Sequence, residues 1–259
     1  MVLNQILEPL LRPLLDSVGP FWTVFIVSIT VSTLTTLVYK FTTDQHHLRS
    51  LKADLKRYQK KLSAQKNNPE KALKIQKDLM KVNGEYMKHS LRSSLYTFLP
   101  IILFFGWLSA NLAYAPLLPG EPFTVNVSLP AGVTDAATIN LPDGITTTDN
   151  LTQKPNERTV SWTLSGDVGH YDASIQIGEE EQFFSFIISD KISYVNPLTT
   201  FDSSTYFSSI QLSNQKLLIF ENVPLLKSIP WISSFGWFGA YFLFSIIFST
   251  SLRKALNLA

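Results

Sequence analysis

Hydroxyl and amide side chains recur at helical spacing inside long apolar stretches of this sequence. Eight of them are Ser28, Ser32, Thr35, Thr36, Ser109, Asn111, Ser245 and Ser249. In the first stretch, Ser28, Ser32 and Thr36 are four residues apart, so they share one face of a helix. Such groups hydrogen-bond within or between helices, or they line a hydrated groove. The residues alone leave both interpretations open.

Two methionines and six lysines form a second set, between residues 42 and 94. Met80 and Met87 are seven residues apart on one side of a predicted helix, where they either pack or contact apolar ligands of varied shape. The lysines take outward positions: Lys52, Lys56, Lys60, Lys74, Lys77 and Lys81. They form either a solvated face or a contact with ribosomal RNA or anionic lipid headgroups.

Catalysis and bound cofactors have no support in the sequence. It contains no phosphate-binding loop, dinucleotide fingerprint, nucleophile elbow or zinc-protease motif. The chain has no cysteine, which excludes disulfides and thiolate metal sites. His46 and His47 are adjacent and diverge on a helix, so we expect no metal site there. We therefore expect neither an enzyme nor a cofactor.

Three apolar stretches are long enough to cross a membrane, since about 20 helical residues span a core of ~30 Å. We predict spans within residues 20–41, 95–115 and 231–251. Their uncharged stretches, 21–39, 95–115 and 231–251, hold no Asp, Glu, Lys, Arg or His, which argues against an ion-coupled transporter. Residues 1–19 have leucines on one face and predict an amphipathic helix in the membrane interface, with prolines that break it into turns.

The charged residues fall into two blocks of opposite sign. Residues 40–92 carry 14 Lys or Arg against 5 Asp or Glu, whereas residues 116–230 carry 5 against 13. Positive charge collects in cytoplasmic loops. We therefore expect segment 42–94 and the tail 252–259 inside the cell. The N-terminus and residues 116–230 are then outside, and the expected location is the plasma membrane.

Segment 42–94 has the apolar spacing of an antiparallel coiled-coil hairpin. The first series is Leu48, Leu51, Leu55, Tyr58 and Leu62, and the second is Ala72, Ile75, Leu79, Val82 and Tyr86. Asn67, Asn68 and Pro69 interrupt the two series. We expect Asn68 to cap the second helix and Pro69 to begin it.

Residues 116–230 have the pattern of a β-rich domain. Strands are predicted at 123–129, 137–141, 159–164, 171–177 and 182–189, separated by Pro, Gly, Asn and Asp. Their lengths suit a small antiparallel sandwich. The expected fold class is an α-helical membrane protein: a three-span bundle with a cytoplasmic antiparallel coiled-coil hairpin and an inserted extracytoplasmic all-β, sandwich-like domain.

Three groups of motifs resemble archaeal members of the YidC-like insertase superfamily. The first is VSTLTTLVYK at 31–40 with TDQ at 43–45. The second is QKDLM at 76–80 and MKHSLR at 87–92, leading to FLP at 98–100. The third is GWFGAY at 236–241, SIIFS at 245–249 and LRKAL at 252–256. The resemblance covers the hairpin and the three spans, and does not cover the outer β-domain.

This resemblance implies a membrane protein insertase or chaperone that needs no cofactor. In that family a helical bundle forms a groove, open to cytosol and lipid, that receives a nascent transmembrane segment. The eight hydroxyl and amide residues are then the groove candidates, and Met80 and Met87 are candidate substrate contacts. Nascent membrane proteins, the ribosome, translocon components and lipids are the implied partners, and DNA is not. Bacterial relatives often carry an arginine in the groove, which no span here has.

Two other functions fit parts of the sequence. The chain is alternatively a membrane-anchored surface-binding or structural protein that acts through its outer β-domain. A third hypothesis is a signalling subunit that dimerises through the coiled coil. The interruption at Asn67 to Pro69 disfavours it, because a hairpin satisfies its own apolar faces within one chain.

Overall fold

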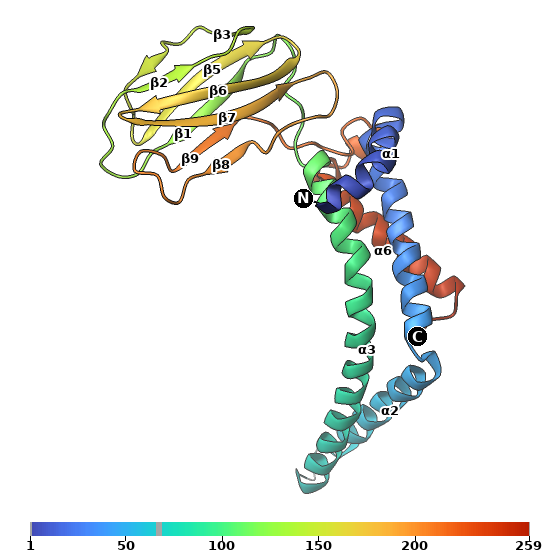
Figure 1. Ribbon diagram of the computed structural model, residues 1–259. Coiled ribbons are helices and arrows are strands. Elements are labelled where there is room, and N and C mark those ends of the chain that lie inside the picture. The colour runs from blue at the N-terminus through green and yellow to red at the C-terminus, as the bar shows by residue number, and fades with distance from the viewer. Residues whose placement is uncertain (1, 66–68, 259) are drawn as a thin grey trace. The chain divides into compact units, whose positions relative to one another are not determined.

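The computed structural model describes residues 2–65 and 69–258, and the chain divides into two compact units (Figure 1). The helical unit comprises Met1–Trp107 with Phe238–Ala259, and the β unit comprises Leu108–Trp237. Two helical segments in the described ranges are long and apolar enough to cross a membrane, Ile6–Thr42 and Leu95–Leu112. A membrane protein with a helical N-terminal part and a β-rich C-terminal part is thereby supported.

The first helix, α1 (Val2–Thr42), is bent at Gly19. Gly19 has φ 78° and ψ 177°, a conformation that glycine adopts without steric cost. The bend separates the predicted interfacial segment 1–19 from the predicted span 20–41. The helix runs through Pro9 and Pro13, so the predicted break into turns does not occur. A buried row of Leu7, Leu11 and Leu15 holds this segment against its neighbours despite the backbone bonds that proline removes.

Two helices lie side by side in the hairpin, α2 (Gln45–Ala64) and the first half of α3 (Pro69–Leu112) (Figure 1). Asp44 caps α2, because its carboxylate accepts a hydrogen bond from the backbone N–H of His47 at 3.0 Å. Both predicted apolar series are buried or half-buried. Supercoiling of the pair stays a prediction. Asn67 and Asn68 lie outside the described residues, so the predicted cap at Asn68 does too.

Helix α3 does not end at residue 94, where the hairpin and the second span were expected to meet. It continues without interruption from Pro69 to Leu112 and includes Pro100. The last helix differs more from expectation. Residues 231–251 were predicted as one span, but α5 (Pro230–Ser233) ends before α6 (Trp237–Ala255) begins.

The reason for this break lies in the backbone at Phe235. Its carbonyl accepts a hydrogen bond from the backbone N–H of Ile219 at 3.0 Å. The Phe235 carbonyl therefore bonds to a segment earlier in the chain and does not take part in a continuous helix. Helix α6 also reaches past residue 251, and Arg253 and Lys254 lie in its last turn. It is not among the two candidate spans found in the described ranges. A third crossing therefore stays a prediction.

Two antiparallel sheets form the β unit. One has the strand order β3-β5-β1-β9-β8 and the other β4-β2-β6-β7. The strands are β1 (Phe123–Ser128), β2 (Ala137–Asn140), β3 (Ile145–Thr147), β4 (Thr152–Gln153), β5 (Thr159–Gly166), β6 (Gly169–Ile177), β7 (Glu180–Ile188), β8 (Leu198–Thr200) and β9 (Ser209–Leu212). The short helix α4 (Pro224–Lys227) follows. A single apolar core lies between the sheets, with Trp162 and Phe186 among its largest buried side chains.

The five predicted strands correspond to β1, β2, β5, β6 and β7, each with ends within two residues of the prediction. Four strands were missed, and two of these, β8 and β9, extend the sheet well beyond residue 189. Strand β9 pairs with β1 through Val125 opposite Leu212, which places it inside the sheet. The missed strands are two to four residues long, too short for a periodic pattern to reveal.

Candidate functional site

The hydroxyl groups predicted on the first span form a buried row on α1. Ser28, Ser32 and Thr36 of the predicted face are all buried, as is Thr23, which was not among the predicted groove residues, whereas Ile29 and Leu34 on other faces of the same helix are exposed. The predicted common face therefore exists. In this conformation, however, neighbouring side chains cover it. It is a closed polar row and not the wall of an open groove. We call these four residues the hydroxyl row.

Two of these four hydroxyls, and that of the neighbouring Thr35, bond to their own helix. Thr23 donates to the carbonyl of Gly19 at 2.8 Å, and Ser28 donates to that of Val24 at 2.6 Å. Thr35, which is half-buried, donates to Val31 at 2.8 Å. Ser32 differs, because its Oγ is buried and has no hydrogen-bond partner among the described residues. A buried hydroxyl without a partner costs about 1–3 kcal/mol, so Ser32 is the one member of the row that stands to gain from a ligand.

The other predicted groove residues are not all covered in this way. Ser245 and Ser249 on α6 are half-buried, and Ser245 donates to the carbonyl of Phe242 at 3.0 Å. Ser109 and Asn111 are in the β unit, at the end of α3. Ser109 is exposed and Asn111 is half-buried. The hydroxyl row is therefore the only predicted group, among the described residues, that the structure brings together as a buried set.

Aromatic rings join α6 to α1 and α3 in the helical unit. Phe25 on α1 contacts Phe244 and Phe248 edge-to-face, both at 5.2 Å between ring centroids. On α3, Phe105 contacts Tyr241 at 4.8 Å. Such contacts hold helices by dispersion and weak electrostatics, and contain no strong hydrogen bond. They suit a joint that opens and closes.

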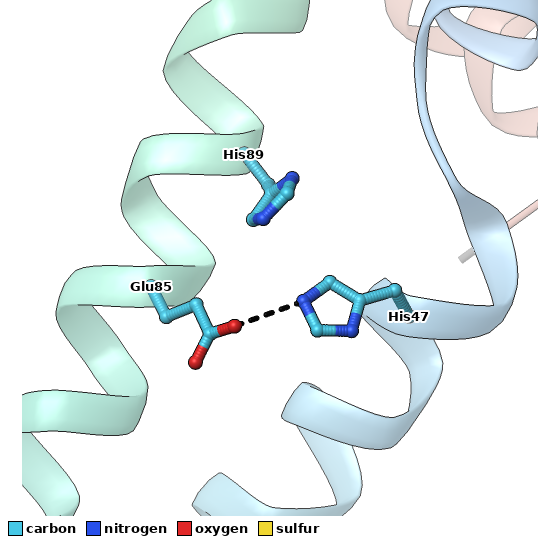
Figure 2. A group of neighbouring side chains, drawn as sticks. All are labelled: His47, Glu85 and His89. Atoms are coloured by element: carbon cyan, nitrogen blue, oxygen red, sulfur yellow. Dashed lines mark hydrogen bonds and ion pairs between the residues drawn. The ribbon is translucent and has the colours of Figure 1, made fainter.

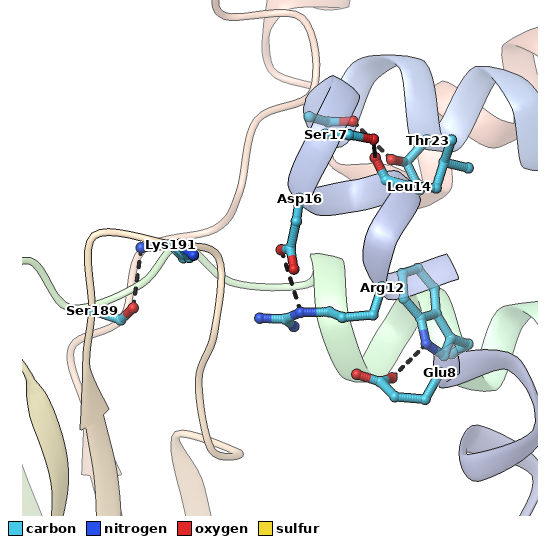
Figure 3. Close-up of polar contacts among 10 residues, drawn as sticks. Glu8, Arg12, Leu14, Asp16, Ser17, Thr23, Ser189 and Lys191 are labelled. Carbon is cyan, nitrogen blue, oxygen red and sulfur yellow. Dashed lines mark hydrogen bonds and ion pairs between the residues drawn. The ribbon is translucent and has the colours of Figure 1, made fainter. Parts of the chain in front are cut away.

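Charged residues on the N-terminal segment were not predicted to have a role. Glu8, Arg12 and Asp16 follow one another at four-residue spacing (Figure 3). Glu8 Oε2 accepts a hydrogen bond from the indole N–H of Trp107 at 2.7 Å, and Arg12 pairs with Asp16 at 3.4 Å. Trp107 is fully buried, so its bond to Glu8 ties the N-terminal segment to α3. Their i, i+4, i+8 spacing in the sequence could have indicated that these three residues share one face of the helix.

The hairpin exposes an apolar line along α3. Met80 and Met87 are 66% and 51% exposed, which leaves the two predicted substrate contacts open to a ligand. Leu73 and Leu91 are also exposed and were not predicted. Leu73 and Met80 are seven residues apart, as are Met80 and Met87, so they follow one side of the helix. The sequence analysis considered only Met80 and Met87 and overlooked that Leu73 continues the same seven-residue repeat.

All six predicted lysines of the hairpin are exposed. Lys74 also lines a cavity of about 520 Å³ between α2 and α3, with Tyr58, Lys61 and Ile75 among the other lining residues. Lys61 Nζ lies 5.7 Å from the centre of the Tyr58 ring. The hairpin thus presents positive charge next to apolar surface.

The C-terminal tail reaches the start of the hairpin. The Arg49 guanidinium on α2 donates a hydrogen bond to the carbonyl of Asn257. The Arg253 guanidinium lies 5.0 Å from the centre of the Tyr39 ring. The predicted tail 252–259 and the beginning of the hairpin therefore lie close together.

His47 has partners that adjacent-residue reasoning did not reveal. Glu85 and His89 on α3 lie beside it, with candidate ligand atoms all within 4.8 Å of one another (Figure 2). The sequence prediction compared His46 with His47 only, whereas the neighbours come from a different helix, and the nearer of them in sequence, Glu85, is 38 residues further along the chain.

A comparison with protein families matches residues 4–150 to the family described as integral membrane protein EMC3/TMCO1-like. The match covers more than half of the 259 residues. It includes α1, the hairpin, α3 and the first strands of the β unit. The resemblance had been expected to stop before the β-domain and to include the last span. No curated protein and no solved structure matches the chain.

Proposed function

Because the chain belongs to the EMC3/TMCO1-like family of integral membrane proteins, within the Oxa1/YidC/Alb3 insertase superfamily, we propose that it is a membrane protein insertase or chaperone. It receives nascent transmembrane segments and releases them into lipid. The family match carries this proposal. An archaeal origin stays a prediction.

The hydroxyl row is the contact that we propose for the client segment. A transmembrane helix crossing a bilayer must carry its polar groups through a region where unpaired groups are costly. The row offers hydroxyls in that region, and Ser32 has an unused donor and acceptor. Entry of a client requires displacement of the side chains that cover the row. The aromatic joint between α1 and α6 is the proposed point of opening.

The exposed line of Leu73, Met80, Met87 and Leu91 is the proposed place of first capture. Flexible methionine side chains adapt to apolar segments of varied shape. The lysines beside them favour an approach to anionic partners, either ribosomal RNA or lipid headgroups. Substrate hydrophobicity drives the transfer, so the proposal includes no cofactor, no catalytic residue and no DNA. Ribosome and translocon components remain proposed partners.

The proposed topology follows the charge distribution. The basic hairpin is cytoplasmic and the acidic residues 116–230 are outside, with the N-terminus outside and the protein in the plasma membrane. Helix α6 makes the third crossing. The contact between Arg49 and Asn257 supports a tail on the same side as the hairpin.

Site-specific photocrosslinking during translation tests the function. Probes at Ser32, Met87 and Ser245 are combined with a stalled membrane-protein substrate, and Leu34 on an exposed face of α1 is the control. We expect crosslinks to the nascent chain from Met87 and Ser32 that are much stronger than from Leu34. No crosslink from Met87 or Ser32, with folded protein and bound ribosomes present, would contradict the proposal.

The alternative function, surface binding by the β unit, rests on one observation. Phe183 lies on β7 at the edge of its sheet and is largely exposed. Most of the β unit can be deleted without separating the flanking residues, because the N–H of Ala115 donates to the carbonyl of Gln215 at 2.8 Å. Replacement of residues 116–214 by a short linker therefore joins neighbouring positions. We expect the Met87 crosslink to survive. Loss of it in a stably inserted variant would favour the alternative.

A further inference from the structure

We propose that His47, Glu85 and His89 bind a divalent transition-metal ion, Zn²⁺ or a close relative, that joins the two helices of the hairpin at its base. Nothing in the family match assigns such a site. It is also independent of the proposed insertase function, because its test measures metal binding and not insertion.

The three side chains come from two helices, α2 and α3. Glu85 and His89 are four residues apart on α3, so they project from the same face, a spacing that metal-binding helices use. His47 is the third residue of α2, and the hydrogen bond from its backbone to the Asp44 carboxylate fixes the start of that helix. Only the fold brings the two helices together.

The distances are already close to those of a coordinated ion. Bonds of about 2.0–2.1 Å in a tetrahedron place ligand atoms roughly 3.3 Å apart. His47 Nε2 and Glu85 Oε1 are 3.1 Å apart, which fits (Figure 2). All the candidate ligand atoms lie within 4.8 Å of one another, so a side-chain movement of at most about 1.5 Å completes the set. Glu85 and His89 are exposed, which leaves their side chains free to make that movement.

A simple pair of His47 and Glu85 explains less of the geometry. It leaves the position of His89 unexplained, although this ring lies 4.8 Å from the His47 ring in an edge-to-face arrangement. In the metal-free state, a hydrogen bond joins Nε2 of His47 to the Glu85 carboxylate. A metal ion takes the place of that hydrogen, which is released or moves to the other ring nitrogen.

The donor set decides the class of ion. Two imidazole nitrogens and one carboxylate oxygen suit Zn²⁺, Cu²⁺ or Ni²⁺, whereas Ca²⁺ and Mg²⁺ prefer oxygen ligands. Three protein ligands leave a fourth position for water. The ion would link α2 to α3 next to Leu48 and Leu51, where the buried part of the hairpin begins. It would therefore limit the separation of the two helices near the membrane end.

The test uses the full chain in detergent, without a polyhistidine tag and freed of metal by a chelator. Co²⁺ is titrated while its visible absorption is recorded, and Zn²⁺ is then added to displace it. We expect one Co²⁺ per chain. Loss of an outer partner of a metal ligand weakens binding by 10–100-fold, so His47→Ala and His89→Ala should each weaken it by at least about 100-fold. His46→Ala is the matched control and should leave affinity within about two-fold.

Amide hydrogen exchange supplies a second readout that separates loss of the site from loss of folding. Zn²⁺ should slow exchange at residues 45–51 and 84–90 in the natural sequence and in His46→Ala. His47→Ala and His89→Ala should keep the metal-free exchange pattern and lose the response to Zn²⁺. Absence of Co²⁺ binding, or binding that His89→Ala leaves unchanged, would overturn the proposal.

Discussion

The two units differ in how many of their large apolar side chains are exposed. In the β unit, a single buried core holds twenty apolar residues, among them Val125, Trp162 and Ile175. In the helical unit, Leu10, Leu95 and Leu99 are largely exposed, while the hydroxyl row is buried. Apolar surface in water is costly at about 25 cal/mol per Å². The exposed leucines of the helical unit are therefore explained if its solvent is lipid.

Buried polar groups are paired differently in the two units. In the β unit, the buried indole N–H of Trp162 donates to the carbonyl of Asn150 at 3.0 Å. In the helical unit, hydroxyls bond their own backbone, and Ser32 has no partner among the described residues. Each unit retains a buried polar atom without a partner among the described residues, Asn214 Oδ1 in the β unit and Ser32 Oγ in the helical unit. Only Ser32 lies on an apolar helix long enough to cross a membrane, where we propose that a ligand enters.

The largest expected effect is in the β core. Trp162→Ala should lower the free energy of unfolding of the β unit by about 3–5 kcal/mol, because it removes a fully buried ring and leaves the Asn150 carbonyl without its donor. Trp22→Ala, at a position on α1 that is 52% exposed, should leave β-unit unfolding unchanged. Both variants are measured by heating the full chain and using the proteolysis of the β unit to report its unfolding. If the two substitutions destabilised the β unit equally, the proposed difference between the units would be wrong.

An intermediate effect is expected where the N-terminal segment meets α3. Glu8→Ala should destabilise the helical unit by about 1–3 kcal/mol, because the buried Trp107 N–H loses its acceptor. Glu8→Gln keeps an oxygen acceptor and should cost clearly less. Thermal stability in detergent distinguishes the two variants. If they behave alike, the hydrogen bond does not hold the segment.

A smaller effect of opposite sign is expected at Ser32. Ser32→Ala removes a buried hydroxyl without a partner and should stabilise the helical unit by about 1 kcal/mol. Ser28→Ala should bring no such gain, because the Ser28 hydroxyl bonds to Val24. The same Ser32 variant should insert client segments more slowly, measured with a model substrate in proteoliposomes. A Ser32→Ala protein that is destabilised would show that the hydroxyl has a partner after all.

The smallest effect is a local dependence on pH in the β unit. The Ser204 side chain, followed by Gln182 and backbone N–H groups, bonds the Glu180 carboxylate and lowers its pKa. A lowered pKa means that this contribution is present above the ordinary carboxylate pKa and is lost as the pH falls through the lower, folded value. The protection of the Thr205 and Tyr206 amides against exchange, relative to an unstructured amide at the same pH, should therefore fall on acidification. Glu180→Gln should abolish that response, and a pH response that persists in this variant would exclude Glu180 as its source.

Long periodic elements were predictable, and contacts between distant elements were not. Strands such as β5, with alternate residues buried, were found from the sequence, whereas β4 has only two residues and no pattern. The common face of Ser28, Ser32 and Thr36 follows from helical geometry, but the sequence does not say what covers it. His47 meets Glu85 and His89 only through the hairpin. The bend at Gly19 follows from the positive φ of its backbone, which the sequence does not specify.

The contrast between the units is tested most directly by cysteine labelling in intact membranes, since the natural chain has no cysteine to interfere. Leu99→Cys and Phe183→Cys replace apolar side chains of similar exposure, 75% and 69%, in the helical and β units. Lys60→Cys reports on the hairpin. A water-soluble maleimide should label Phe183→Cys and Lys60→Cys from opposite sides of the membrane and leave Leu99→Cys unlabelled. Labelling of Leu99→Cys as fast as Phe183→Cys would contradict a lipid-facing helical unit.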